Sequence, residues 1–202
     1  MGAAAVIEVG YAVKALEGRS GDRAVVVNRR DGMLVGAIDG LGHGDAAAEA
    51  ADAAAAVIES TAGEPVEQIV ARCHDALQGT RGAVLTLVDF AIDRKEISWV
   101  GVGNVEARLL EFGTSVLPGA VASAMLFGGV LGHNLPAIRP SRHSVGVGDV
   151  LVMATDGVRA DFARQLQVSG PPRSIAERVL ESSARNDDDA LVVVARFLGE
   201  WK

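Results

Sequence analysis

The N-terminal third of the chain reads as short apolar runs that are interrupted by glycine and aspartate. Residues 4–13, 23–28 and 33–38 are rich in apolar and β-branched side chains, and this pattern predicts strands. Asp31-Gly32 stands between the last two runs and is typical of a tight hairpin turn. The second and third runs are therefore expected to pair as an antiparallel hairpin.

Helical spacing follows this hairpin. An alanine-rich segment begins at Asp45, which can cap it, and is expected to run to about Ser60. In the next segment Thr61 and Glu64 have the spacing of a capping box. Its apolar residues form one stripe, made of Val66, Ile69, Val70, Cys73 and Leu77. Cys73 is thus expected to be a core residue, and no arginine lies six positions later as a cysteine phosphatase would need.

The remainder of the chain repeats strand signals around one more helix. Further strands are predicted at 83–92, 96–102, 107–112, 143–147, 150–154 and 190–197. Ser174 and Glu177 have capping-box spacing for a helix that ends near Ala184. Most strands are joined as hairpins and the helices come in groups. This order favours an α+β layered fold with antiparallel sheets over a doubly wound parallel sheet.

Composition bounds the class of protein. With 202 residues, one domain over residues 1–202 is the default, and the length suffices for a full core. The formal net charge of −7 makes nucleic acid an unsuitable main partner, because phosphate binding needs a basic face. The single cysteine excludes a disulfide framework and a cysteine zinc cluster, which favours a reducing, cytoplasmic setting.

One segment is long enough for a membrane helix. Residues 112–138 contain no Asp, Glu, Lys or Arg, but glycines and prolines interrupt them repeatedly. We therefore expect a strand and a loop beside the functional site, and no membrane partner. The first ten residues lack the basic start of a secretory signal.

Aspartates stand at several strand ends. Asp39 ends one strand of the predicted hairpin, and Asp22 begins the other; a turn at Asp31-Gly32 places Asp39 opposite about position 24. Asp156 ends another apolar strand, and the Asp187-Asp188 pair precedes the last one. Carboxylates gathered in this way suit Mg²⁺ or Mn²⁺, which prefer oxygen ligands. Taken singly, each aspartate fits a turn or a cap equally well.

Five short motifs together resemble one enzyme family. They are SGD at 20–22, AIDGLGHG at 37–44, GVGNVEARL at 101–109, ATDGV at 154–158 and NDDDALVVV at 186–194. In this order they resemble the metal-dependent PPM/PP2C serine/threonine phosphatases, in particular the compact bacterial branch of SpoIIE, RsbU and RsbX. The sequences of the DGLGHG and GVGNVE motifs are most similar to those of the RsbX type. We expect no sensor, membrane or linker segment along the chain, and this expectation narrows the resemblance to a catalytic domain alone. The resemblance implies an αββα sandwich of two antiparallel sheets flanked by helices.

The resemblance also implies roles for individual residues. Asp39 would bridge two Mn²⁺ or Mg²⁺ ions, and the Gly40 carbonyl would bind one of them. Asp156 and Asp187 would hold the other ion, and Asp22 would support the site directly or through water. Asp187 is preferred to its neighbour because the family's ligand is the first acid of its pair.

Three further residues depart from the family pattern or lack a fixed role. Arg19 is near, but not in register with, the phosphate-binding arginine of the animal enzymes, and is a candidate for that role. His43 lies in the glycine-rich loop, where it could move a proton or orient a water, or only make a local hydrogen bond. Asp189 stands where the family usually has a small residue.

The implied reaction is hydrolysis of phosphoserine or phosphothreonine by a metal-activated water, without a phosphorylated enzyme intermediate. The implied partners are phosphorylated STAS-domain proteins of the stressosome, of the RsbR/RsbS type. Two alternatives stay open: a catalytically silent module that binds phosphoprotein, and a two-metal phosphatase for a small phosphorylated metabolite. A dinucleotide site is disfavoured, since Gly101–Glu106 lacks the last glycine of GxGxxG and runs into a strand.

Overall fold

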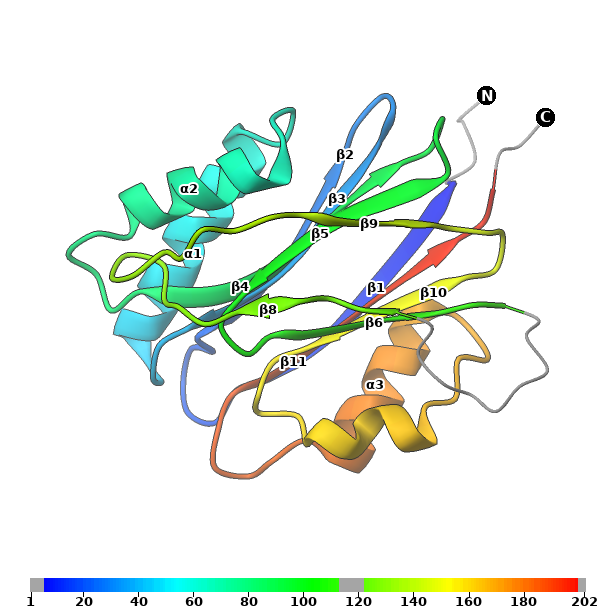
Figure 1. Ribbon diagram of the computed structural model, residues 1–202. Helices are drawn as coiled ribbons and strands as arrows, with labels where there is room; N and C mark the ends of the chain where they lie inside the picture. Colours follow the sequence, from blue (N-terminus) through cyan, green and yellow to red (C-terminus); the bar gives the residue numbers. More distant parts are fainter. Residues whose placement is uncertain (1–5, 113–121, 200–202) are drawn as a thin grey trace.

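The computed structural model describes residues 6–112 and 122–199, except for the side chains of 164 and 165. Two sheets pack face to face, and helices cover both outer faces (Figure 1). Sheet I has the strand order β1-β11-β10-β6-β7. Its strands are β1 (Ile7–Lys14), β11 (Ala190–Phe197), β10 (Val150–Ala154), β6 (Glu106–Leu110) and β7 (Ala122–Ser123).

Sheet II has the order β2-β3-β4-β5-β8, and β9 also pairs with β5. Its strands are β2 (Asp22–Asn28), β3 (Gly32–Gly40), β4 (Ala83–Ala91), β5 (Glu96–Val102), β8 (Leu126–Phe127) and β9 (Ser141–Ser144). The strand pairs are antiparallel, with the exception of β5 and β8. The helices are α1 (Asp45–Ser60), α2 (Val66–Ala76), the 3₁₀ helix η1 (Ala160–Gln165) and α3 (Pro172–Ser183).

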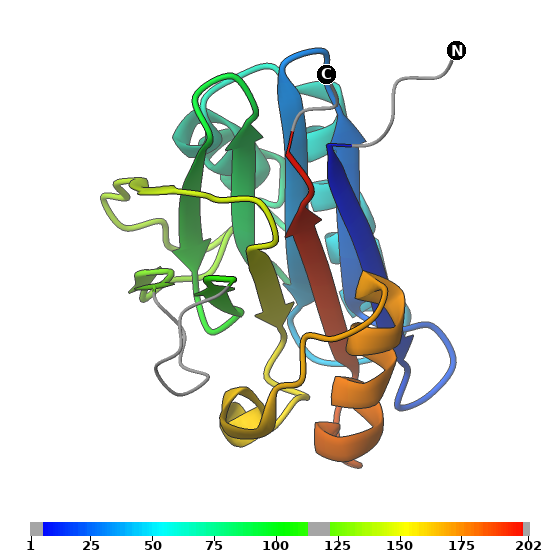
Figure 2. The same cartoon turned by 90° about the vertical axis from the view of Figure 1, so that its right-hand side faces the viewer.

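Each inner strand is apolar on both faces because each sheet is covered on both sides. In β11, Leu191 and Val193 face the core between the sheets, whereas Val192 and Val194 face the core below α3. This alternation follows from the two-residue period of a strand. A third core lies between sheet II and the pair α1–α2, and Figure 2 shows these two helices and α3 on opposite sides of the sandwich. The predicted α+β, αββα architecture is confirmed.

The hairpin turn between β2 and β3 differs from the prediction by one residue. The amide of Arg29 donates to the carbonyl of Gly32 at 2.9 Å, so the turn residues are Arg30 and Asp31. Gly32 instead belongs to β3, where a Cβ would collide with the carbonyl oxygen of Phe90 on β4. The glycine is therefore required by the close approach of two strands, and the shift of the turn by one residue changes the register of the whole hairpin.

The expected helix caps are wrong. None of the described α-helices has a side-chain hydrogen bond at its N-cap, and the N-caps are Gly44, Pro65 and Pro171. Glycine at φ 77° or proline sets the chain direction there in place of a polar cap. The residues predicted to cap were Asp45, Thr61 with Glu64, and Ser174 with Glu177. Thr61 instead follows the end of α1, where its hydroxyl donates to the carbonyl of Val57 at 2.7 Å.

Part of the uncharged segment 112–138 lies outside the described residues, at 113–121. The rest forms β7, β8 and loops, and Gly128 to Val130 line a cleft. Among the described residues, no helix combines the length and the apolar character that crossing a membrane requires.

Candidate metal centre

Asp22 and Asp39 face each other at the open end of the β2–β3 hairpin. They are directly opposite partners in the antiparallel ladder. The sequence placed Asp39 opposite about position 24, and the turn, which lies one residue earlier than predicted, shifts it onto Asp22. Asp22 is only 1% exposed, although no cationic side chain of the described residues pairs with it. Two carboxylates thus lie opposite each other without a cationic side chain of the described residues to neutralise their charge.

Two residues that follow strand β10 of sheet I, Thr155 and Asp156, lie close to this carboxylate pair. Strand β10 ends at Ala154, and the buried Thr155 that follows donates its hydroxyl to Asp22 Oδ2 at 2.8 Å. The same Thr155 oxygen accepts the amide of Leu191 on β11 at 2.9 Å. Thr155 therefore ties sheet I to the carboxylate that begins β2. Asp156 comes directly after it at the surface.

A cleft of about 440 Å³ opens above these strand ends. Asp39, Asp156 and Asp188 line it together with Asn104, whose side-chain amide donates to Asp156 Oδ2 at 2.7 Å. The other lining residues are small or apolar: Leu41, Gly42, Val84, Gly103, Gly128, Gly129 and Val130. The glycines contribute no side chains to the walls of the cleft. The only ionisable side chains of the described lining are carboxylates.

The electrostatics of this site favour neutral carboxyl groups as long as no cation is bound. Burial raises the pKa of Asp22 from 3.8 to about 7, although the hydrogen bond from Thr155 lowers it. Burial likewise raises the pKa of Asp39 from 3.8 to about 8, and the charge of Asp22 adds to this shift. Asp156 and Asp188 repel both groups further. Each carboxylate would be stabilised by a cation placed between them.

These shifts predict how the stability of the metal-free protein depends on pH. Because the folded pKa values of Asp22 and Asp39 exceed the unfolded one, the native state binds more protons between about pH 4 and 8. Their contribution to stability is complete below pH 4 and is lost as the pH rises through 7 to 8. The free energy of unfolding should therefore fall by about 1.4 kcal/mol per pH unit for each group.

Urea unfolding in chelator at pH 5.5, 6.5 and 7.5 measures this slope. Asp39→Asn should flatten it, since one titrating group is gone and its neighbour loses a like charge. Asp93→Asn, in the exposed turn between β4 and β5, should leave it unchanged. An equal slope in wild type and Asp39→Asn would contradict the assigned shifts.

The residues present fit a pair of hard divalent cations. Facing carboxylates with raised pKa values, a cleft lined only by acids among its ionisable groups, and a nearby backbone carbonyl at Gly40 are the donors that Mg²⁺ and Mn²⁺ use. In the part of the chain that the structure describes, no three carboxylate, histidine or cysteine groups already form a closed ligand set. Such cations retain several waters, so an open set of carboxylates suits them.

The three consecutive acids 187–189 point in three directions. Asp187 is 75% exposed and pairs with Arg185 at 3.4 Å, and it does not line the cleft. Asp188 does line the cleft, and burial raises its pKa. Asp189 turns into the interior and is 3% exposed. The residue brought to the site is thus the second acid of the run, whereas the family resemblance implied the first.

Comparison with known proteins places the chain in a family. The family described as Stage II sporulation protein E (SpoIIE) matches residues 29–198, which is most of the chain. The chain belongs to the SpoIIE family. This finding confirms the resemblance drawn from the five motifs.

Individual relatives agree with this family. "Phosphoserine phosphatase RsbX" of Bacillus subtilis (strain 168) is 33% identical over 73 residues, which span 36% of this chain and 37% of that relative. A solved chain described under "The bacterial stressosome: a modular system that has been adapted to control secondary messenger signaling" has 29% identity and a TM-score of 0.84, covering 94% of this chain and 99% of its own. RsbX in complex with magnesium superposes with a TM-score of 0.81 at 22% identity, covering 94% of both chains.

Within this SpoIIE-family fold, Asp189 has a structural task that the sequence did not reveal. Its Oδ1 accepts the amide of Leu16 at 2.7 Å, and its Oδ2 accepts the amide of Gly21 at 2.6 Å. The carboxylate thereby fixes the loop that leads into Asp22. These two amides explain why this acid is buried.

Asp189→Ala should lower the free energy of unfolding by about 2–4 kcal/mol, because one buried amide and one half-buried amide lose their acceptors. Asp189→Asn keeps one oxygen acceptor and should cost about half as much. The exposed Asp187, two positions earlier, offers the matched control: Asp187→Ala should stay within about 0.5 kcal/mol of wild type. Urea denaturation at fixed pH measures all three; an Asp189→Ala variant as stable as the control would contradict this role.

Two further candidates lie away from the cleft lining. Arg19 donates to Asp52 Oδ2 on α1 at 2.7 Å and lies 3.8 Å from Asp45 Oδ1, so its charge is engaged by the helix. His43 is exposed in the loop before α1 and does not line the cleft. Gly40 is held between β2 and α1, and a Cβ there would collide with the carbonyl of Ala47.

Sequence reasoning missed Asn104 and Thr155. Both stand inside motifs that carried the resemblance, GVGNVE and ATDGV, so the signal was present without a role attached. Their roles depend on contacts between segments that are distant in sequence, because Asn104 reaches Asp156 and Thr155 reaches Asp22. Such contacts join residues 52 and 133 positions apart and have no local sequence signature.

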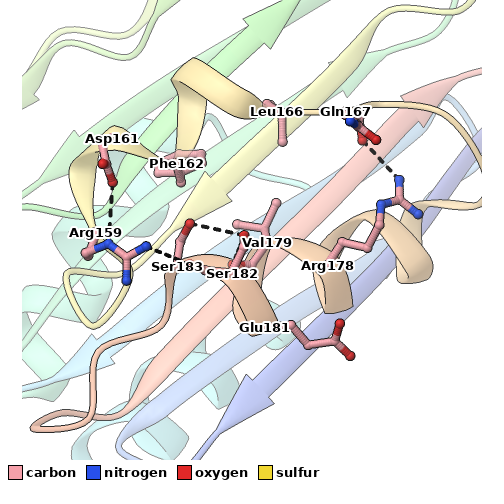
Figure 3. Close-up of a pocket in the computed structure, with 10 residues that line it drawn as sticks. All are labelled: Arg159, Asp161, Phe162, Leu166, Gln167, Arg178, Val179, Glu181, Ser182 and Ser183. Atoms are coloured by element: carbon pink, nitrogen blue, oxygen red, sulfur yellow. Dashed lines mark hydrogen bonds and ion pairs between the residues drawn. The ribbon is translucent and has the colours of Figure 1, made fainter.

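A second cavity, of about 420 Å³, lies between η1 and α3 (Figure 3). Its two arginines are occupied by backbone carbonyls: Arg159 donates to Ser182 at 2.6 Å, and Arg178 donates to Ser169 at 2.6 Å and to Gln167 at 3.0 Å. These contacts fasten η1 and the following segment onto α3. The charged groups of this cavity thus serve packing and offer no carboxylate cluster.

Proposed function

We propose that this SpoIIE-family protein is a protein serine/threonine phosphatase that depends on two Mg²⁺ or Mn²⁺ ions. The observation that supports this proposal most directly is the pair of buried Asp22 and half-buried Asp39, which are directly opposed in the β2–β3 ladder, with Asp39 lining an acidic cleft. Asp39, Asp156, Asp188 and the Gly40 carbonyl would hold the ions, with Asp22 as a direct or water-mediated support. When bound, such ions supply an activated water and neutralise charge on a phosphoryl group.

The chain's own residues orient these ligands. The hydroxyl of Thr155 fixes one oxygen of Asp22, and the amide of Asn104 fixes one oxygen of Asp156. A carboxylate held in one orientation loses less entropy when a cation binds. No described side chain lines the cleft as a cysteine, serine or histidine nucleophile. This lining supports direct hydrolysis without a phosphorylated side chain.

The proposed substrate is a phosphoserine or phosphothreonine on a STAS-domain protein of the stressosome. Support comes from the phosphoserine phosphatase RsbX as a relative and from the match to the stressosome study. The cleft supports it too, because its low glycine walls leave room for an approaching loop. We further propose that residues 1–202 act as one phosphatase domain in the cytoplasm, where the buried, free Cys73 needs no oxidising environment.

Phosphate release from a phosphoserine STAS-domain protein, from free phosphoserine and from p-nitrophenyl phosphate tests this proposal. In Mn²⁺, the ratio kcat/KM should be at least about tenfold higher for the protein than for either small phosphate. A preference for a small phosphate would indicate metabolite hydrolysis instead. Tight binding of the phosphoprotein without turnover would indicate a silent binding module.

A further inference from the structure

Arg81 lies beside the acidic cleft without belonging to its described lining. It stands between α2 and β4, is exposed, and its Nη1 lies 2.6 Å from the position that a Cβ on Gly42 would occupy. Gly42 itself lines the cleft, three residues after Asp39. The guanidinium thus rests over a wall of the site, on a residue that has no side chain to displace it.

The backbone that carries Arg81 is held firmly. The ring Nε2–H of His133 donates to the carbonyl oxygen of Arg81 at 2.9 Å. The next residue, Gly82, donates its amide to Thr80 Oγ1 at 3.0 Å and accepts the amide of Leu41 at 3.0 Å. Leu41 also lines the cleft. These bonds couple the position of Arg81 to the wall over which its side chain lies.

The position of Arg81 matters because the cleft beside it carries only negative charge in its described lining. A phosphoryl dianion that enters the cleft meets Asp39, Asp156 and Asp188 and no cationic side chain in the described lining. Arg19, the cation expected from the sequence, is paired with Asp52 on α1. The guanidinium of Arg81 makes no hydrogen bond or ion pair with any of the described residues. Its planar fork is suited to two oxygens of a phosphate.

We propose that Arg81 binds the phosphoryl group of the substrate. This inference rests on the proposed phosphatase function and adds the residue that offsets the cleft's negative charge for an anionic substrate. The arginine would contribute charge-assisted hydrogen bonds to phosphoryl oxygens, and would draw the group toward the strand ends that carry the aspartates.

The test compares Arg81→Ala and Arg81→Lys with Arg94→Ala. Arg94 is an exposed arginine in the turn between β4 and β5, so its loss changes the net charge equally without touching the cleft. In Mg²⁺, Arg81→Ala should raise KM for p-nitrophenyl phosphate, and the Kd for inorganic phosphate by calorimetry, about tenfold or more. Arg81→Lys should recover part of both losses, because it keeps the charge but not the fork.

Two outcomes would overturn the proposal. In the first, Arg81→Ala and Arg94→Ala have the same KM and the same Kd for phosphate. In the second, Arg81→Ala weakens binding of the phosphoprotein substrate only, which would mean that Arg81 contacts the protein part of the substrate and not its phosphoryl group. If wild type shows no turnover, the proposed function fails, and the calorimetry decides alone: weaker phosphate binding by Arg81→Ala still supports the site, and equal or absent binding overturns it.

Discussion

Asp39→Asn is expected to reduce kcat/KM for phosphate release by at least about 10³-fold, or about 4 kcal/mol of transition-state stabilisation. Asp39 faces Asp22 across the hairpin and lines the cleft with Asp156 and Asp188. An amide at this position removes one charge and one anionic oxygen from the point at which both sheets meet. Since cation binding depends on that charge, the loss should exceed that of any other single carboxylate.

Stability separates this effect from unfolding. Burial raises the pKa of Asp39 to about 8, so a neutral side chain is what the metal-free fold prefers at neutral pH. Asp39→Asn should therefore be at least as stable as wild type in chelator at pH 7.5, while Mn²⁺ should stabilise it much less than it stabilises wild type. Asp93→Asn, in the distant turn, should keep full activity. Near-normal turnover by Asp39→Asn would contradict the assignment of the centre.

Asp188→Asn is expected to lower kcat/KM by about 10²-fold or more and to weaken the apparent Mn²⁺ affinity, whereas Asp187→Asn should stay within about twofold of wild type. The two residues are neighbours with the same chemistry, and only their orientation differs. Asp188 lines the cleft, and Asp187 is 75% exposed beside Arg185. Activity titrated with Mn²⁺ for both variants measures the difference.

The reverse result would restore the assignment that the sequence favoured. A large loss in Asp187→Asn with a mild effect of Asp188→Asn would mean that the loop 185–189 rearranges when cations bind. Equal large losses would mean that both acids are ligands. Because Asp187→Ala also serves as the stability control for Asp189, one set of variants resolves the roles of all three acids.

The β2–β3 hairpin shows how far local pattern predicts this site. Alternating apolar runs and a turn signal were sufficient to bring Asp22 and Asp39 to one end of a hairpin. The exact register was not predictable. A glycine is needed at position 32 because a side chain there would collide with the carbonyl of Phe90 on β4, and not because the turn requires it. Contacts between strands that are distant in sequence therefore fixed the final step.

The acidic run 187–189 shows where spacing stops being informative. Three identical side chains in succession carry no pattern that distinguishes them. Their directions are set by Arg185, by the cleft, and by the amides of Leu16 and Gly21 that bind Asp189. Only the folded arrangement distinguishes the acid that faces solvent from the acid at the cleft and the acid in the interior.

Cations were harder to predict than carboxylates. Arg19 is close in sequence to Asp22 but is drawn to Asp52 on α1, while Arg81 is distant in sequence and close to the cleft wall. A long, flexible side chain takes the partner that its surroundings supply, so proximity along the chain is a poor guide. In contrast, apolar positions such as Cys73 and the strand 190–197 followed directly from periodicity and are confirmed as buried.

The central claim is that the acidic cleft is a divalent-cation-dependent phosphatase centre. Its most direct test is the rate of p-nitrophenyl phosphate hydrolysis by the purified protein, measured with Mn²⁺, with Mg²⁺ and after chelation, beside Asp39→Asn. The predicted result is turnover that requires added Mn²⁺ or Mg²⁺, disappears with chelator and is lost in Asp39→Asn. Folded protein that releases no phosphate with either ion, or releases it equally in chelator, would contradict the claim.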